Sequence, residues 1–153
     1  MYPDHYHNPR QTGQVIGPDQ MFADVAPRRA LAWIIDTVLI AAMTTVLIPL
    51  TGFIALFFLG GLYLAVSFLY RWIGLARASG TLGMRLLGLT FRDRQGQPID
   101  GITAFLHTLG YTLSVAFVFP QIISVFLMTF TRAHQGISDI VLGTALVNRA
   151  ALD

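Results

Sequence analysis

The chain has 153 residues, of which 54% are hydrophobic and only 12% are charged, and its net charge at pH 7 is +2. Soluble domains usually carry about 25% charged residues, so this composition excludes an ordinary soluble domain and indicates an integral membrane protein. The lack of cysteine excludes disulfides and thiolate metal sites, and the clustering of arginines in loops argues against nucleic acid as a partner.

Residues 1–26 are predicted to form a polar cytoplasmic tail. His5 and His7 lie close together there, but no third metal ligand is near, so a solvated tail explains them better than a metal site does. Residues 21–27 are mildly amphipathic, and we expect this stretch to lie on the membrane surface. The tail lacks the basic region of a cleaved signal peptide, which predicts that the first helix is retained as an anchor.

Two apolar runs predict two membrane-spanning helices, at residues 27–50 and 53–73. A spanning helix needs about 20 mainly apolar residues, and both runs are long enough. Arginines precede the first run and follow the second, whereas the short turn between them carries none. Because basic residues concentrate in cytoplasmic loops, the N-terminus is predicted to be cytoplasmic. Arg71 and Trp72 then mark the interface end of the second helix.

The segment 74–102 is predicted to be a basic cytoplasmic loop with some local structure. Residues 89–92 are expected to form a short strand, followed by a turn at 93–96. Asp100 is placed to cap the helix that follows, because an aspartate can accept hydrogen bonds from the first free N–H groups of a helix.

The third helical region, residues 103–131, is ambiguous. As one straight helix it would be roughly 40 Å long, which exceeds the hydrocarbon core of about 30 Å. Pro120 predicts a break or a kink. One shape is a long, tilted, kinked span, which would leave the C-terminus outside. The other is a helical hairpin that turns near Phe119 and Pro120 and returns the C-terminus to the cytoplasm.

The C-terminal block, residues 132–149, contains a strand-like stretch at 144–147 and precedes a short tail at 150–153. The expected fold class is therefore all-α transmembrane. It has two spanning helices and a third region that is either a long Pro-kinked helix or a helical hairpin. A small cytoplasmic two-stranded β element is a further expectation.

Arg29, Trp33 and Asp36 share one face of the first helix, because they are spaced i, i+4, i+7. An ionised Asp36 that faced lipid would cost several kcal/mol, so this residue needs a proton, a partner or water. Two interpretations stay open. In the first, Asp36 has a structural role and is hydrogen-bonded to a loop arginine or to a helix end. In the second, its carboxylate binds a proton or a cation.

Asp139 lies between two glycines in a short apolar stretch that is too short to span a membrane. The pattern around it is typical of a surface loop with a solvated charge. His134 is interpreted in the same way, as a loop histidine rather than a metal ligand.

Three blocks, in order, resemble the RDD family of small bacterial membrane proteins. They are residues 28–36 (RRALAWIID), 79–100 (SGTLGMRLLGLTFRDRQGQPID) and 134–149 (HQGISDIVLGTALVNR). The chain departs from the family pattern at Ser138, where a histidine is frequent, and at Met84, where the family has lysine.

The resemblance implies a multi-pass protein of the bacterial inner (cytoplasmic) membrane, in which Arg29, Asp36 and Asp139 are signature residues. It also implies that the two predicted strands pair, which favours the hairpin. We then expect Arg29, Asp36, Arg85 and Asp139 to converge at the cytoplasmic membrane surface. The family is usually described as transport-related, and cation–proton antiport has been attributed to some members.

Two functions follow as hypotheses: transport of a small ion, proton or cation, and an accessory or assembly role in a larger membrane complex. Neither requires a cofactor or a metal, and no motif indicates an enzyme. Two or three helices cannot enclose a path, so transport would require a homo-oligomer. Gly61 and Ala65 form a small-xxx-small pair that suits such a contact, although packing within the chain would also explain it.

Overall fold

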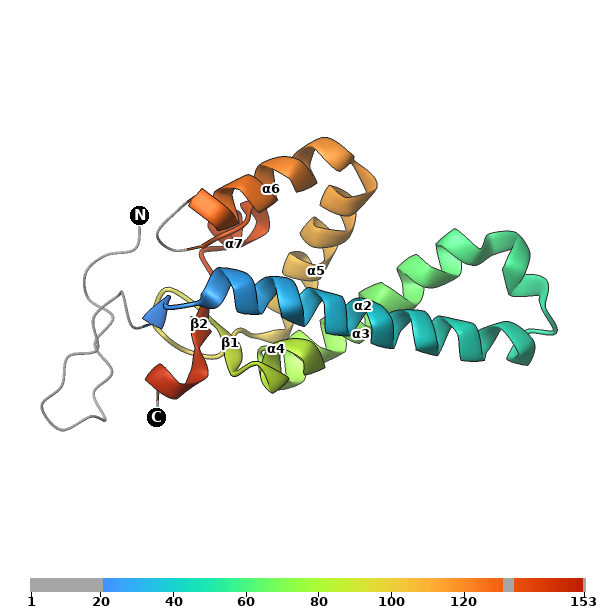
Figure 1. Cartoon of the computed structure of the whole chain (residues 1–153), viewed down its shortest axis with the longest axis horizontal. Coiled ribbons are helices and arrows are strands. Elements are labelled where there is room, and N and C mark those ends of the chain that lie inside the picture. The colour runs from blue at the N-terminus through green and yellow to red at the C-terminus, as the bar shows by residue number, and fades with distance from the viewer. Residues whose placement is uncertain (1–20, 131–133, 153) are drawn as a thin grey trace, which may run out of the picture.

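Two long antiparallel helices form an arm that projects from a base (Figure 1). The computed structural model describes residues 21–130 and 134–152. The arm consists of α2 (Val25–Leu50), the 3₁₀ helix η1 (Ile54–Phe58) at its tip, and the returning helix α3 (Leu59–Ala78). Both α2 and the segment Ile54–Ala78 are long and apolar enough to cross a membrane, which confirms the predicted pair of spans.

The second span continues beyond its predicted end at residue 73 and ends at Ala78. Arg71 does not mark a membrane interface as expected, because its side chain is only 8% exposed and turns inward towards Asp36. The helix stops where Ser79 adopts a left-handed conformation with φ 50°, a common helix C-terminus.

The base is built around a two-stranded antiparallel sheet. Strand β1 (Leu89–Arg92) pairs with β2 (Ala145–Asn148), so that Phe91 lies opposite Leu146. The predicted strand pairing is confirmed, with the second strand one residue later than expected. The N–H of Phe91 donates a 2.7 Å hydrogen bond to the carbonyl of Ser79, which ties the sheet to the end of α3.

Apolar side chains from the sheet and four helices form the core of the base. Its buried members are Val25, Ala32, Leu75, Met84, Leu89, Phe91, Ile99, Ala104 and Leu146. Residues 21–27, expected on the membrane surface, also pack on the base. Met21 is buried against Ala145 and Val147 of β2.

The predicted loop at 74–102 is largely structured. It holds the end of α3, the short helix α4 (Leu82–Leu86) and β1 before α5 (Gly101–Ala116) begins. As predicted, Asp100 caps α5, since its carboxylate accepts a 2.8 Å hydrogen bond from the N–H of Thr103. Hydrogen bonds from Thr103 lower the pKa of the Asp100 carboxyl.

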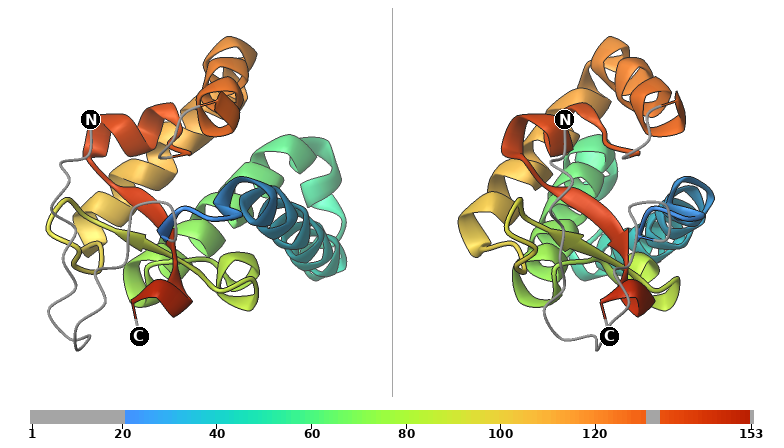
Figure 2. Two further views of the ribbon diagram at one scale, coloured as in Figure 1. Left: turned by 60° about the vertical axis from the view of Figure 1, so that its left-hand side comes forward. Right: turned by 90° about the vertical axis from the view of Figure 1, so that its left-hand side faces the viewer.

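The third helical region consists of α5 and α6 (Val118–Phe130), which are bent by 116° relative to each other. The break falls at Phe117 rather than at the predicted turn, because Pro120 fits the first turn of α6, where helix N–H groups need no partner in the helix. Helix α6 folds back from the end of α5, while α5 packs on α3 (Figures 1 and 2).

After α6 the chain forms α7 (Ile137–Leu142), which contacts both α5 and α6, and then enters β2. Region 101–130 therefore leaves the base and returns to it, which corresponds to the hairpin alternative. The 3₁₀ helix η2 (Arg149–Ala151) follows the sheet.

Candidate functional site

Asp36 is fully buried on α2 and accepts three hydrogen bonds. The Tyr70 hydroxyl donates to Oδ1 at 2.6 Å, and the Thr81 hydroxyl donates to Oδ2 at 2.6 Å. The N–H of Gly83 donates to Oδ1 at 2.9 Å. We call Asp36, Tyr70, Arg71, Thr81 and Gly83 the Asp36 cluster. Its donors come from α3, from α4 and from the residue that caps α4, so one carboxylate joins three helices.

Gly83 lets α4 approach α2 closely enough for this arrangement. A Cβ at position 83 would lie 2.4 Å from the carbonyl oxygen of Ala32 and 2.8 Å from Oδ1 of Asp36. Real Cβ atoms do not tolerate such distances, so any larger residue would push α4 away. Thr81 supports the same contact, because its hydroxyl also accepts a 3.3 Å hydrogen bond from the N–H of Met84 and caps α4.

Arg71 supplies the positive charge nearest to Asp36. Its Nη1 lies 3.9 Å from Oδ2 of Asp36, and its guanidinium lies over the ring of Tyr111 on α5, 4.4 Å from the centroid. A cation over an aromatic ring is attracted by the ring's negative face. The Tyr111 hydroxyl in turn accepts a 2.8 Å hydrogen bond from Nε1 of Trp33. Arg71 therefore links the Asp36 cluster to α5.

Asp139, on α7, is the second fully buried carboxylate. Nη1 of Arg29 lies 2.6 Å from its Oδ2, and Nε2 of His107 on α5 lies 2.5 Å from its Oδ1. The N–H of Gly136 donates to Oδ2 at 2.9 Å. We call Arg29, His107, Gly136 and Asp139 the Asp139 cluster. It joins the start of α2 to α5 and α7.

The charge state of Asp139 follows from competing effects. Burial would raise the pKa of its carboxyl, but the Arg29 guanidinium and the hydrogen bond with His107 outweigh it. The pKa of Asp139 therefore lies well below its usual range, and the residue is ionised at neutral pH.

The RDD family model matches residues 24–143, most of the chain. The chain belongs to the RDD family. No curated protein and no solved structure matches it. With its two long apolar helices, this RDD-family chain is an integral membrane protein.

The four residues predicted to converge, Arg29, Asp36, Arg85 and Asp139, do not form one cluster in this RDD-family chain. Arg29 and Asp139 meet, as expected. Asp36 has separate partners, and its nearest arginine is Arg71. Arg85 is exposed and forms no ion pair with any residue that the structure describes. The physical reason is that α4 turns Gly83, not Arg85, towards Asp36.

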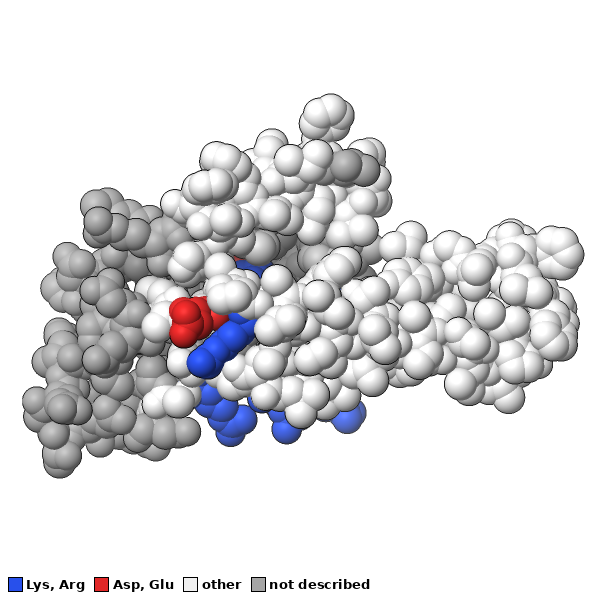
Figure 3. All heavy atoms as spheres, in the orientation of Figure 1, with Lys and Arg blue, Asp and Glu red and all other residues white. Residues whose placement is uncertain are grey.

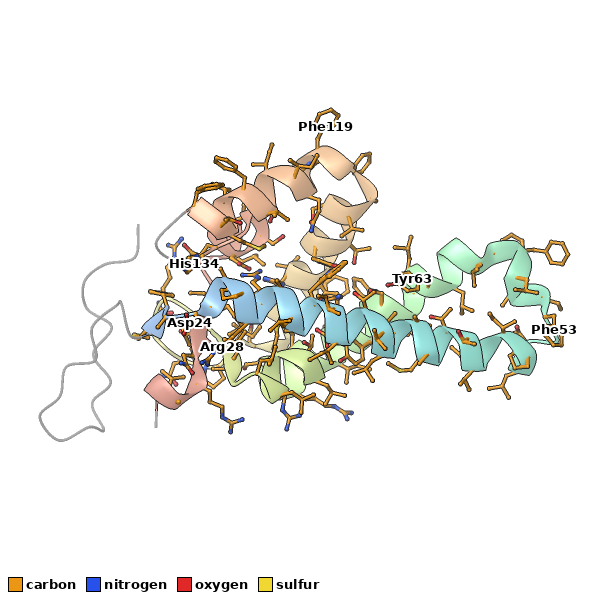
Figure 4. The ribbon with its side chains drawn as sticks, in the orientation of Figure 1. Asp24, Arg28, Phe53, Tyr63, Phe119 and His134 are labelled. Carbon is orange, nitrogen blue, oxygen red and sulfur yellow. The ribbon has the colours of Figure 1, made fainter. Side chains whose placement is uncertain are left out.

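The solvated-loop interpretation of Asp139 is wrong, whereas His134 lies outside any helix or strand, as expected of a loop histidine. Asp139 is fully buried, and Nδ1 of His134 lies 2.7 Å from the carbonyl oxygen of Met128. The carbonyl of His134 also accepts a 3.3 Å hydrogen bond from Arg29. Figure 4 shows His134 on the α6 side of the base, near the start of α2. His5 and His7 lie outside the described residues.

Sequence reasoning missed four partners: Tyr70, Arg71, Thr81 and His107. One signal was available, because His107 is the only ionisable side chain besides tyrosine between residues 102 and 131. An ionisable residue inside an apolar helix usually faces a polar partner rather than lipid. Among residues 21–130 and 134–152, no group of three histidine or acidic side chains could hold a metal ion.

The small-residue pair on α3 faces outward. Gly61 and Ala65 are both exposed, and a Cβ at Gly61 would meet no atom within 4 Å. Packing within the chain therefore does not explain this pair.

Proposed function

We propose that this RDD-family chain is a non-catalytic accessory or assembly subunit of a larger membrane complex. One observation carries the proposal: every oxygen of the two buried carboxylates already has a hydrogen-bond partner within the chain. A transported cation would have to displace those donors and approach an arginine. Saturated ionic clusters are better suited to holding helices in place, because removing either partner of a buried pair is strongly destabilising.

The surface of the arm supports a lateral role. Its tip exposes Phe53, Phe57 and Phe58, with Phe57 86% exposed, and Phe53 lies at the far end of the arm (Figure 4). Gly61 and Ala65 lie on the same helical arm. Small residues allow close approach of a partner helix within a bilayer, and aromatic side chains add contact area.

Bacterial inner-membrane location, with the base in the cytoplasm, belongs to the same proposal. Residues 37–70 carry no charge, and Figure 3 shows the outer half of the arm without charged side chains. The basic side chains in that view gather on the base, which suits the cytoplasmic side of a membrane.

Proton- or cation-linked transport is the second candidate. It is favoured by the contact between His107 and Asp139, 2.5 Å apart and next to Arg29. Histidine is the side chain that titrates nearest to neutral pH, and a buried histidine–carboxylate pair can hold a shared proton. The two spans of the arm cannot enclose a path, so a homo-oligomer would have to form it.

One set of variants distinguishes the candidates. Asp36→Asn and Asp139→Asn remove a buried charge, while Asp24→Asn removes an exposed charge that makes no side-chain cap bond. Each would be tested for membrane abundance, for complex mass in mild detergent and for pH-driven cation flux in vesicles. The accessory role predicts that the wild type shows no pH-driven cation flux. It also predicts that both buried variants lose abundance or leave a heteromeric complex. Normal abundance and assembly with loss of a wild-type flux would favour transport instead.

A further inference from the structure

A long groove runs along the arm between α2 and α3 and reaches α4. Its volume is about 820 Å³. The walls are apolar along most of its length, with Met43 and Val46 on α2 facing Val66 and Ile73 on α3. At the base, the groove ends beside Arg77 and Arg85.

The charge at this end is unbalanced. Among residues 21–130 and 134–152, no acidic side chain lines the groove, and Arg77 and Arg85 are both exposed. Neither arginine forms an ion pair with a residue in the described parts of the chain. The groove therefore offers two free guanidinium groups at one end and an apolar channel behind them.

The dimensions match one membrane leaflet. Val66 and Arg77 both line the groove on α3, and eleven residues at 1.5 Å per residue separate them by roughly 17 Å. Half of a hydrocarbon core of about 30 Å is roughly 15 Å. When the arm spans the bilayer, the arginines thus lie near the headgroups and the apolar walls lie beside the acyl chains of the same leaflet.

We propose that this groove binds one anionic glycerophospholipid. Its phosphate lies between Arg77 and Arg85, and an acyl chain extends along the apolar walls towards Val66. Arginine suits this role because its planar fork donates two hydrogen bonds to a phosphate at once. Basic pockets between spanning helices are known sites for anionic headgroups. A partner helix would fit the walls but would leave both guanidinium groups without an anion.

The bound lipid would also touch the Asp36 cluster. Tyr70 lines the groove, and its hydroxyl donates to Asp36. An acyl chain in the groove therefore packs against the residue that closes this cluster on the α3 side. This inference stands apart from the accessory role, because lipid binding needs no protein partner.

The test compares two double variants with the same loss of charge. Arg77→Gln/Arg85→Gln removes the groove arginines, whereas Arg28→Gln/Arg149→Gln removes two arginines that do not line the groove. The full chain would be reconstituted in phosphatidylcholine nanodiscs with added phosphatidylglycerol. After extraction into mild detergent, retained lipids would be counted by native mass spectrometry.

We expect the wild type and the control to retain one phosphatidylglycerol. The groove variant should bind it roughly 30-fold more weakly, because each of the two arginines contributes binding free energy at an anionic surface. Val66→Phe, which narrows the groove without changing charge, should also weaken retention. Equal loss in the control, equal retention of phosphatidylcholine, or displacement by inorganic phosphate would overturn the proposal. The proposal would also be overturned if the lipid-free protein formed a dimer in which the partner copy covers the groove residues.

Discussion

Arg29 and Asp139 are separated by 110 residues in sequence, yet Nη1 of Arg29 lies 2.6 Å from Oδ2 of Asp139. The pair joins the first turns of α2 to α7. Along the chain, the rest of the arm and the bent helices α5 and α6 lie between these two residues. Both side chains are largely buried, with 13% and 1% of their surfaces exposed. Water therefore screens this pair little, and its loss should be costly.

Arg29→Gln is expected to lower the free energy of unfolding by about 3 to 5 kcal/mol, because Asp139 would remain buried without its cation. Thermal unfolding in detergent micelles would measure the change. Arg28→Gln is the matched control, since Arg28 forms no ion pair with the described residues. The double variant Arg29→Gln/Asp139→Asn should recover part of the loss. An additive double variant would mean that the two residues do not interact.

Tyr70→Phe should lower the free energy of unfolding by about 1.5 to 3 kcal/mol, because it removes a hydrogen bond to a charged, buried acceptor. Tyr63→Phe, on the same helix, removes a hydroxyl that forms no hydrogen bond with any residue in the described part of the chain, and it should change little. The two variants would be compared by the same melting experiment. Equal effects would show that the Tyr70–Asp36 bond contributes nothing specific.

Gly83→Ala is expected to lower the free energy of unfolding by about 1 to 3 kcal/mol, because the added Cβ would lie 2.4 Å from the carbonyl oxygen of Ala32. Gly60→Ala offers a control with open space, since a Cβ there would meet nothing within 4 Å. Alanine favours a helix over glycine, so the control should be neutral or slightly stabilising. A normal melting temperature for Gly83→Ala would contradict the close approach of α4 to α2.

Asp139 should make stability depend on pH in the acidic range. Because its folded pKa is lowered, the unfolded chain binds more protons between the two pKa values, and stability rises with pH there. The contribution is complete above about pH 5 and is lost as the pH falls below about 4. The difference in melting temperature between the wild type and Asp139→Asn should therefore narrow as the pH drops from 5 to 3. A constant difference would exclude this role for the carboxylate.

The cysteine-free sequence permits a direct test of topology. Single cysteines at Gln95 and Ala150, both exposed in the base, should react with an impermeant thiol reagent from the same side of the membrane. A cysteine at Phe53, at the tip, should react from the opposite side. If the cysteine at position 150 reacted together with the one at position 53, region 101–130 would cross the membrane completely.

The spans, the Asp100 cap and the first strand were predictable because their signals are local. Apolar length defines a spanning helix, and a capping aspartate lies next to the N–H groups that it serves. Arg71 misled the sequence reading, because an arginine beside a tryptophan at the end of an apolar run is typical of an interface. Its true environment depends on Tyr111, which comes from another helix.

The two carboxylate clusters were only partly predictable. Asp36 could be identified as a residue in need of a partner, but its donors lie 34 to 47 residues away. Asp139 is part of a six-residue helix beside two glycines, a pattern that also describes loops. Its burial arises from long-range contacts with Arg29 and His107, which leave no periodic trace in the sequence.

The position of β2 bears on how the chain is made. The arm and β1 are synthesised first, but Leu146, which lies opposite Phe91 in the sheet, comes more than fifty residues later. Until that segment leaves the ribosome, Arg29 lacks its carboxylate and the core of the base lacks one wall. Insertion of the arm into the bilayer and completion of the base are thus separate events. A nascent chain halted before residue 139 would present an unpaired guanidinium and uncovered apolar side chains, which quality-control proteases recognise.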